Sequence, residues 1–176
     1  MGSGLVIGGG AAGLAEAIAA AECGDTVTVA EKMDRVGKKI LATGNGRCNL
    51  MNTGAPRYPG NAAFAAAVLS CCGAEEQKAF WEHLGLRLRQ EEAGRVYPVS
   101  SQASSVLDAL RLQLTALHVR VVTGVSITAL QRENDGWTAL SADGQQFRAN
   151  RVIISGGGCA QPKLGSDGSA LRLLTN

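Results

Sequence analysis

Three glycines near the N-terminus constrain this chain more than any other feature. Gly8, Gly10 and Gly13 follow a short apolar run, precede an Ala-rich segment, and are followed by a second apolar run that ends at Glu31. This order of strand, glycine turn, helix and strand predicts a βαβ unit over residues 4–31. A bare glycine triplet is weak evidence in a chain with 23 glycines. Here it comes with both strands, the helix and the acid, which makes it specific.

Each glycine has a physical role in binding a dinucleotide. Gly8 permits the tight turn, Gly10 lets a pyrophosphate approach the backbone, and Gly13 lets the helix pack closely on the strand. The first helical turn, with Ala11 and Ala12, then presents backbone N–H groups and the positive end of the helix dipole to the phosphates. The spacing predicts an anion site that needs no side-chain cation.

Glu31 is placed to accept hydrogen bonds from the ribose hydroxyls of the bound nucleotide. A carboxylate at this position repels a 2′-phosphate, which argues against NADP in this site. The alternative is an Ala-rich helix with a glycine turn and no ligand. The complete spacing favours the ligand.

Bulk composition limits the class of protein. The length of 176 residues and the hydrophobic content of 45% are typical of one compact domain. A net charge of +2 and an aromatic content of 4% argue against a nucleic-acid partner. No apolar stretch reaches membrane-spanning length, and the N-terminus lacks the basic region of a signal peptide. We therefore expect a cytoplasmic protein without a membrane partner.

The five cysteines are odd in number and contain no Cys-x-x-Cys pair, which indicates a reduced compartment and no metal site. Cys71 and Cys72 fall in a predicted helix, and we expect them to be small buried apolar residues.

The rest of the chain predicts an α/β fold, a Rossmann-like FAD/NAD(P)-binding domain whose parallel sheet is joined by an antiparallel three-stranded β-meander. Residues 32–53 read as a phosphate-facing loop with a short helical turn. The other predicted elements are helices at 61–72, at 75–84 and from about 101, a hairpin of 86–90 with 95–97, a third parallel strand at 119–122, meander strands at 125–131, 136–141 and 145–149, and a last strand at 151–155.

NAD and FAD share the opening fingerprint, so the later segments must separate them. A nicotinamide domain usually continues with parallel βα units. Here a meander precedes a strand that ends in Gly156 and Gly157, an arrangement similar to two-domain flavoproteins. The sequence therefore favours FAD.

Three further motifs carry a family resemblance. They are the run 37–49 with its Gly-Asn-Gly-Arg-Cys-Asn core, the run 94–100, and the glycine-rich stretch 156–168. Together with the N-terminal glycines, they resemble the BaiN-like family of NAD(P)/FAD-dependent oxidoreductases, also described as aminoacetone-oxidase-like flavoproteins. The resemblance spans the whole chain.

Membership of such a family implies a bound FAD, with Gly8, Gly10, Gly13 and Glu31 on its adenosine and pyrophosphate half. It implies further contacts at Lys32, Gly37, Lys38, Lys39, Gly44, Asn45, Gly46, Arg47, Cys48, Asn49, Val125, Gly156 and Gly157.

Several of these assignments have simpler alternatives. Arg47 can oppose a phosphate or the charge of a reduced flavin. A solvated basic face is the preferred reading of Lys32 and Arg35, and Val125 is equally an ordinary β-branched strand residue. Cys48 reads as structural, because no second cysteine lies near it for disulfide exchange.

Relatives of this family run to more than double this length, so residues 1–176 resemble their N-terminal FAD-binding domain, without the substrate domain and the last flavin-binding segment. The expected function is a flavoprotein oxidoreductase that transfers hydride through FAD, with NAD(P)H as the diffusible donor and an unidentified small-molecule substrate. The alternative is a catalytically incomplete dinucleotide-binding module, a fragment or half of a split enzyme completed by a C-terminal chain. No catalytic residue is assigned.

Overall fold

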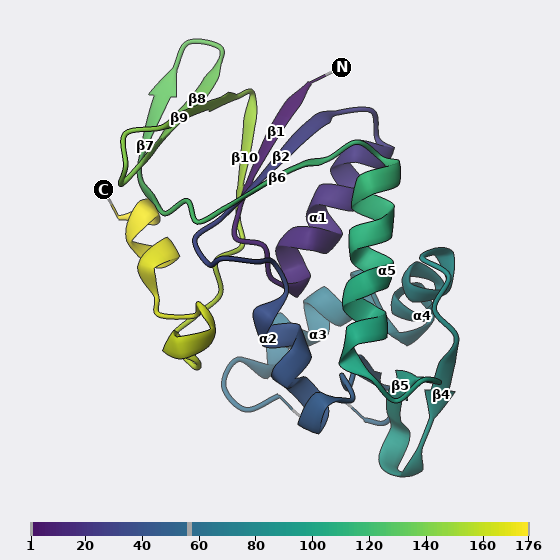
Figure 1. Cartoon of the computed structure of the whole chain (residues 1–176). Coiled ribbons are helices and arrows are strands. Elements are labelled where there is room, and N and C mark those ends of the chain that lie inside the picture. The colour runs from purple at the N-terminus through teal and green to yellow at the C-terminus, as the bar shows by residue number, and fades with distance from the viewer. Residues whose placement is uncertain (1, 56–57, 176) are drawn as a thin grey trace. The chain divides into compact units, whose positions relative to one another are not determined.

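The computed structural model describes residues 2–55 and 58–175 (Figure 1). These residues form two compact units, one made of Met1–Ile40 with Leu110–Asn176 and the other of Leu41–Ala109. The unit boundaries fall within two helices, α2 (Lys38–Ala42) and α5 (Ala103–Ala116). Each unit is described by itself.

The first unit is built on a parallel sheet in the order β10-β1-β2-β6. In its central pairing, Val6 lies opposite Val29 on one side and Ile153 on the other. The predicted βαβ unit, the third parallel strand and the returning last strand are all confirmed. The strands are β1 (Ser3–Ile7), β2 (Thr26–Glu31), β6 (Arg120–Thr123) and β10 (Arg151–Ile154).

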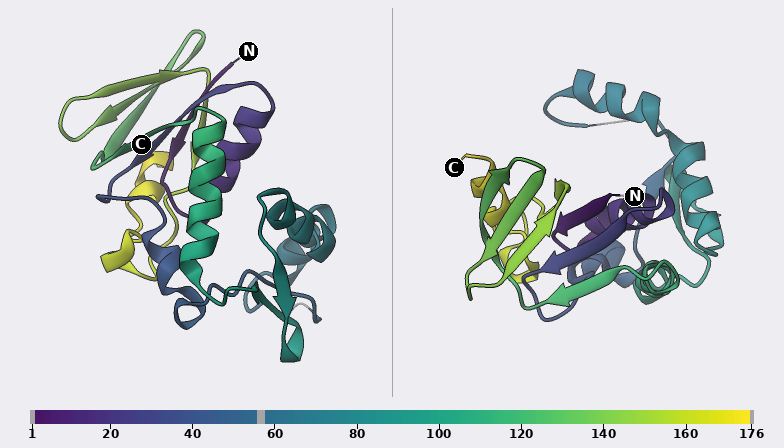
Figure 2. Two further views of the ribbon diagram at one scale, coloured as in Figure 1. Left: turned by 45° about the vertical axis from the view of Figure 1, so that its right-hand side comes forward. Right: turned by 90° about the horizontal axis from the view of Figure 1, so that it is seen from above.

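Helix α1 (Ala11–Glu22) and the part of α5 that belongs to this unit lie beside one another on one face of the sheet (Figure 2). The α1 residues Leu14, Ala17 and Ile18 are fully buried, and their spacing places them on one side of a helix. At the far end of α1, the amide of Gln113 donates to Glu22 over 3.0 Å.

The opposite face of the sheet is covered by the predicted antiparallel meander, which consists of β7 (Ile127–Glu133), β8 (Gly136–Ser141) and β9 (Gln146–Ala149). Leu5 and Ile7 alternate along β1 and point to this side, where they meet Ala139 and Phe147 in one core cluster. Both faces of the central strands β1 and β2 are therefore buried, as their near-continuous apolar sequences require.

Two short 3₁₀ turns follow β10, at Pro162–Leu164 (η3) and Ser169–Leu174 (η4). Leu173 of η4 is 7% exposed and belongs to the same core cluster as the meander. The C-terminal segment is thus packed onto the sheet and is part of the first unit's core.

The second unit combines helices with a small antiparallel sheet in the order β3-β5-β4. The predicted hairpin is confirmed, with Arg89 opposite Tyr97. Strand β3 was not predicted, because two residues are too short to give a periodic signal. The elements are η1 (Thr43–Gly46), β3 (Met51–Asn52), α3 (Ala62–Cys71), α4 (Ala74–His83), β4 (Leu88–Gln90), η2 (Glu92–Gly94) and β5 (Arg95–Pro98).

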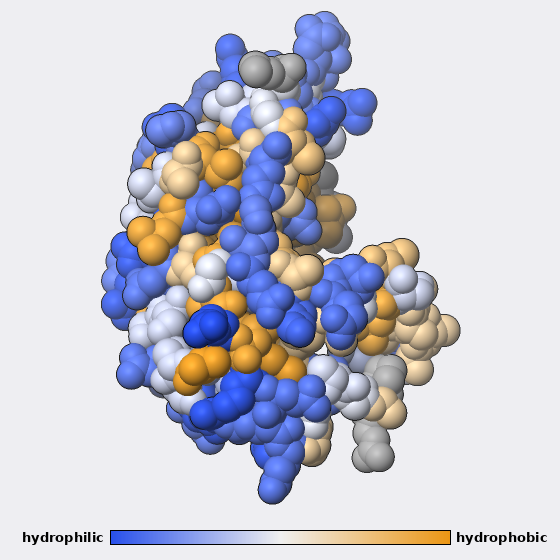
Figure 3. All heavy atoms as spheres, turned by 90° about the vertical axis from the view of Figure 1, so that its right-hand side faces the viewer, coloured by the Kyte–Doolittle hydropathy of each residue, from blue (hydrophilic) through white to orange (hydrophobic). Residues whose placement is uncertain are grey.

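Helix α3 begins as predicted, because the Asn61 side chain accepts the Phe64 N–H over 2.9 Å. The expectation that Cys71 and Cys72 are buried is wrong, since both are exposed. The helix is almost entirely apolar but no α3 residue is buried, and hydrophobic side chains gather over it (Figure 3). Apolar composition predicted burial, whereas burial also requires an opposing surface.

Within the described part of the chain, no helix has both the length and the apolar character needed to cross a membrane.

Replacing Gly13 with alanine tests the contact between α1 and β1. The new Cβ would lie 1.9 Å from the Gly8 carbonyl oxygen, so we expect Gly13→Ala to lower the free energy of unfolding by about 1–3 kcal/mol. The matched control is Gly10→Ala, whose Cβ meets nothing within 4 Å and which should lose less than about 1 kcal/mol. Urea denaturation measures both, and equal losses would contradict the packing described here.

Candidate functional site

The turn after β1 is held in a conformation that suits glycine. Gly8 has a φ of +110°, and a Cβ on it would lie 2.8 Å from the backbone of Gly156. Gly8 N–H donates to the Ala30 carbonyl, and the Ser155 hydroxyl donates to the Gly8 carbonyl over 3.1 Å. The turn is therefore fixed between the ends of β2 and β10.

Gly10 differs from its neighbours because nothing lies within 4 Å of where its Cβ would be. It is the N-cap of α1, and no side chain among the described residues caps this end of the helix. Ala11 and Ala12 of the first turn are exposed. The backbone at Gly10 and the uncapped N–H groups of the first turn border an open space that a Cβ on residue 10 would occupy. A phosphate group fits such a space, because the N–H groups can donate to its oxygens.

Glu31 is 8% exposed and lies at the end of β2. One carboxylate oxygen accepts the Gly9 N–H over 2.6 Å and the other accepts the Met33 N–H over 2.7 Å. The Gly37 N–H donates in turn to the Gly9 carbonyl over 2.8 Å. Each carboxylate oxygen keeps a further lone pair, so the fixed carboxylate can still accept a ribose hydroxyl.

A cavity of about 40 Å³ lies at the carboxyl ends of β1 and β2. It brings together five of the predicted site residues, which are Gly8, Glu31, Lys32, Val125 and Gly156. Ligands in open parallel sheets bind at this edge. The lining residues that sequence reasoning missed are Ile7, Ala30, Ser126, Ile127, Gly165, Ser169, Ala170 and Leu173.

The Val125 N–H donates to the Glu31 carbonyl over 2.9 Å, and Val125 is 4% exposed. Its main chain thus adjoins the Glu31 carbonyl and its side chain belongs to the core cluster. The residue serves the fold as a buried β-branched residue and lines the cavity as well.

Two of the basic residues after β2, Lys32 and Lys38, have acidic partners. Lys32 pairs with Asp167 at 2.5 Å, and Lys38 pairs with Asp34 at 2.7 Å. The Lys39 ammonium lies 3.7 Å from the position of a Cβ on Gly157. The solvated face preferred for Lys32 is wrong, because an ion pair to a residue far along the chain holds this side chain. A contact over that sequence separation leaves no local signal.

The Gly-Asn-Gly-Arg-Cys-Asn motif lies in the second unit and forms a compact loop. Gly44, Asn45 and Gly46 have φ values of +55°, +54° and +80°, and a Cβ on Gly44 would lie 2.6 Å from the Asn49 nitrogen. Cys48 is 6% exposed, and burial raises the pKa of its thiol. Cys48 is therefore buried, as predicted.

Arg47 of this motif makes an ion pair with Glu91, and its guanidinium stacks on the Tyr97 ring at 4.1 Å from the ring centre. The hydrogen bond from Arg47 lowers the pKa of Glu91, and Arg89 also donates to this carboxylate over 2.8 Å. The Arg47 charge is thus balanced within its own unit. Its contact with a phosphate or flavin remains a prediction.

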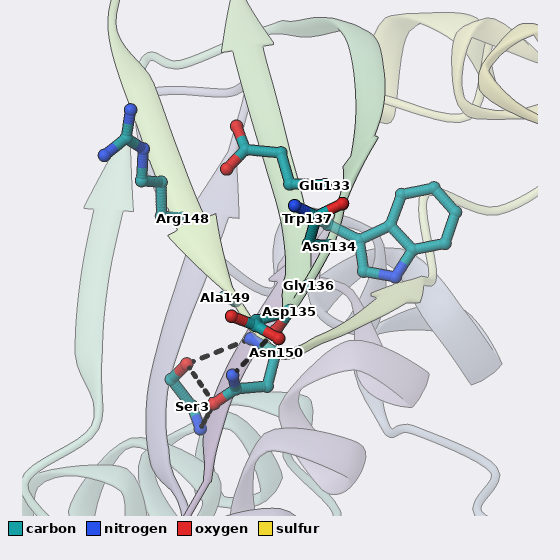
Figure 4. A pocket seen from close by; sticks show the side chains of 9 residues that line it. All are labelled: Ser3, Glu133, Asn134, Asp135, Gly136, Trp137, Arg148, Ala149 and Asn150. Carbon is teal, nitrogen blue, oxygen red and sulfur yellow. Dashed lines mark hydrogen bonds between the residues drawn. The ribbon is translucent and has the colours of Figure 1, made fainter.

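A larger hollow of about 580 Å³ lies at the other end of β1, beside the β7–β8 turn. Figure 4 shows three of its lining residues bonded to one another: the Asn150 side-chain oxygen accepts the Ser3 N–H over 2.9 Å, and the Asn150 side-chain nitrogen donates to the Asp135 carbonyl over 3.0 Å. It contains none of the predicted site residues. No group of acidic, histidine and cysteine side chains in the described ranges could hold a metal ion.

The sheet order, the meander and the glycine turn define a Rossmann-like α/β domain. The chain belongs to the family described as HI0933-like protein Rossmann domain, whose model matches residues 3–176.

Among curated proteins, the chain is similar to a 3-dehydro-bile acid delta(4,6)-reductase of Clostridium scindens, with 46% identity over 173 residues, or 96% of this chain and 42% of the relative. It is also 26% identical to a ribosomal RNA dihydrouridine synthase of Haemophilus influenzae, over 92% of this chain and 42% of that protein. The chain therefore spans about two fifths of the length of these relatives.

Solved structures show the same fold at low sequence identity. THI4 of Thermovibrio ammonificans matches 89% of this chain and 57% of its own, with a TM-score of 0.61 and 14% identity. An oxidoreductase of Methanosarcina mazei matches 92% of this chain and 60% of its own, with a TM-score of 0.56 and 16% identity.

Thiol reactivity tests the buried position of Cys48. The thiolate is the reactive form, so a buried thiol with a raised pKa should react slowly. We expect DTNB to modify the exposed Cys23, Cys71, Cys72 and Cys159 in the native protein, and Cys48 only after unfolding. Peptide mass spectrometry identifies each site, and rapid native modification of Cys48 would contradict the structure.

Proposed function

We propose that this chain is the FAD-binding portion of a flavoprotein oxidoreductase. The observation that carries the proposal is the open backbone at Gly10, which lies at the uncapped start of α1. The preceding residue, Gly9, donates its N–H to the Glu31 carboxylate. Membership of the HI0933-like Rossmann domain family supports it.

The chain's residues would hold FAD along the carboxyl edge of the sheet. The N–H groups of the first α1 turn would bind the pyrophosphate, and the fixed carboxylate of Glu31 would accept the ribose hydroxyls. The cavity residues Val125 and Gly156 would lie beside the adenosine half. Bound FAD would supply hydride acceptance and donation, while the protein orients and shields it.

The electron donor in this proposal is NAD(P)H and the substrate is a small molecule. The reductase of Clostridium scindens, the more similar of the two relatives, supports a reductase role. Because the chain spans 42% of that relative, a second candidate is a dinucleotide-binding module that turns over only with a polypeptide supplying the remaining part.

Cofactor content tests the proposal directly. Purified protein should show flavin absorbance, or acquire it on adding FAD, and denaturation should release FAD that chromatography identifies. Protein that stays colourless and fails to bind added FAD would overturn the proposal. Steady NAD(P)H oxidation by the FAD-loaded chain alone would exclude the second candidate.

Gly10→Ala separates nucleotide binding from folding. The added methyl group would occupy the open space above the turn, where the pyrophosphate would meet the backbone. We expect FAD affinity to fall by about tenfold or more, because hydrogen bonds to a charged group are worth about 1.5–3 kcal/mol. Calorimetric titration with FAD gives the dissociation constant, and unchanged affinity in a folded Gly10→Ala protein would contradict this placement.

A further inference from the structure

The cavity beside Glu31 is small for the nucleotide that the site is proposed to bind. Its volume is about 40 Å³, whereas pockets for small molecules usually measure about 300–1,000 Å³. This volume is too small to enclose an adenosine group, so full enclosure of the adenosine requires one wall of the cavity to move.

Most of the cavity is bounded by structure that cannot move independently. Gly8 follows a central strand, Glu31 ends another, and Val125 is bonded to the Glu31 carbonyl. The remaining wall is the segment 165–174, which contributes Gly165, Ser169, Ala170 and Leu173 to the lining.

This segment fills the space over Gly156. A Cβ built on Gly156 would lie only 2.3 Å from the Ala170 Cβ, so the two residues are in close contact. Gly165 and Gly168 have φ values of +97° and +76°, and glycine leaves this conformation at less steric cost than any other residue. Leu173 belongs to the core cluster, so the part of the wall that can shift away from Gly156 is 165–170, and this shift breaks the hydrogen bond between the Gly168 N–H and the Gly158 carbonyl.

One side chain ties this wall to the sheet. The Lys32 ammonium contacts the Asp167 carboxylate at 2.5 Å and the Ser169 hydroxyl at 2.9 Å. The same Asp167 oxygen accepts the Ser169 N–H over 3.0 Å. Lys32 directly follows Glu31 in the chain, so the attachment starts one residue after the proposed ribose-binding residue.

We propose that Lys32 is a positioning residue of the adenosine pocket. Through Asp167 and Ser169 it holds the 165–170 part of the wall against Gly156, and its release widens the pocket for the nucleotide. The inference rests on the proposed function and adds the residue that controls access to that site. Ion pairs with exposed partners contribute little net stability, so this attachment can open and close readily. Asp167 itself does not line the cavity, which makes it the better residue to change.

Stopped-flow measurement of FAD binding tests the proposal. Asp167→Asn and Lys32→Met should raise both the association and the dissociation rate constants, by up to about fivefold for the loss of one exposed ion pair. Lys32→Arg keeps the charge and the donors and should restore rates close to those of the unmodified protein. Glu82→Gln, which breaks the exposed Lys78–Glu82 pair, is the matched control and should change neither constant.

Hydrogen exchange gives a readout that needs no nucleotide. The Gly168 N–H is bonded to the Gly158 carbonyl and the Leu171 N–H to the Gly168 carbonyl, both over 3.1 Å. These two amides should exchange faster in Asp167→Asn than in the unmodified protein, while amides of β1 stay unchanged. Equal exchange in both proteins would overturn the positioning role of Lys32.

These measurements distinguish a failure of the access role of Lys32 from a failure of the proposed FAD-binding function. FAD binding with unchanged rate constants in Asp167→Asn would overturn the access role and leave the proposed function standing. Absence of FAD binding in every variant, even with faster exchange at Gly168, would overturn the proposed function and the access role with it.

Discussion

The close approach of α1 to the turn after β1 is the contact on which the rest of the first unit depends. Gly13 lies so near Gly8 that a Cβ would come within 1.9 Å of its carbonyl oxygen. This approach lets Leu14 and Ile18 pack on the sheet and sets where α1 begins. The same contact aims the first helical N–H groups at the carboxyl edge, so the packing of α1 and the proposed anion site have one geometric cause.

Glu31 connects that turn to the following strand and loop. Its carboxylate bonds the Gly9 and Met33 N–H groups, so a buried charge is stabilised by two charge-assisted hydrogen bonds. The residue has a structural role whether or not a ribose is present. Its position at the end of β2 therefore follows from folding, whereas the open backbone of Gly10 makes no such structural contact.

Sequence patterns predicted the elements whose signals are local. The glycine spacing located β1, α1 and β2, and turn residues located the meander. The burial of Cys71 was predicted wrongly, because composition does not show whether a helix has a partner surface. The ion pair between Lys32 and Asp167 joins residues that are 135 positions apart in the sequence. Sequence periodicity gives no signal for such a contact.

Gly10 is the residue whose identity the fold alone does not explain. Its φ of −83° is available to any amino acid, and its surroundings leave room for a side chain. Serine, asparagine or aspartate at this N-cap would accept a hydrogen bond from the first turn and stabilise α1 at least as well as glycine. Folding therefore gives no reason to prefer glycine here, whereas a phosphate that must reach the main chain does.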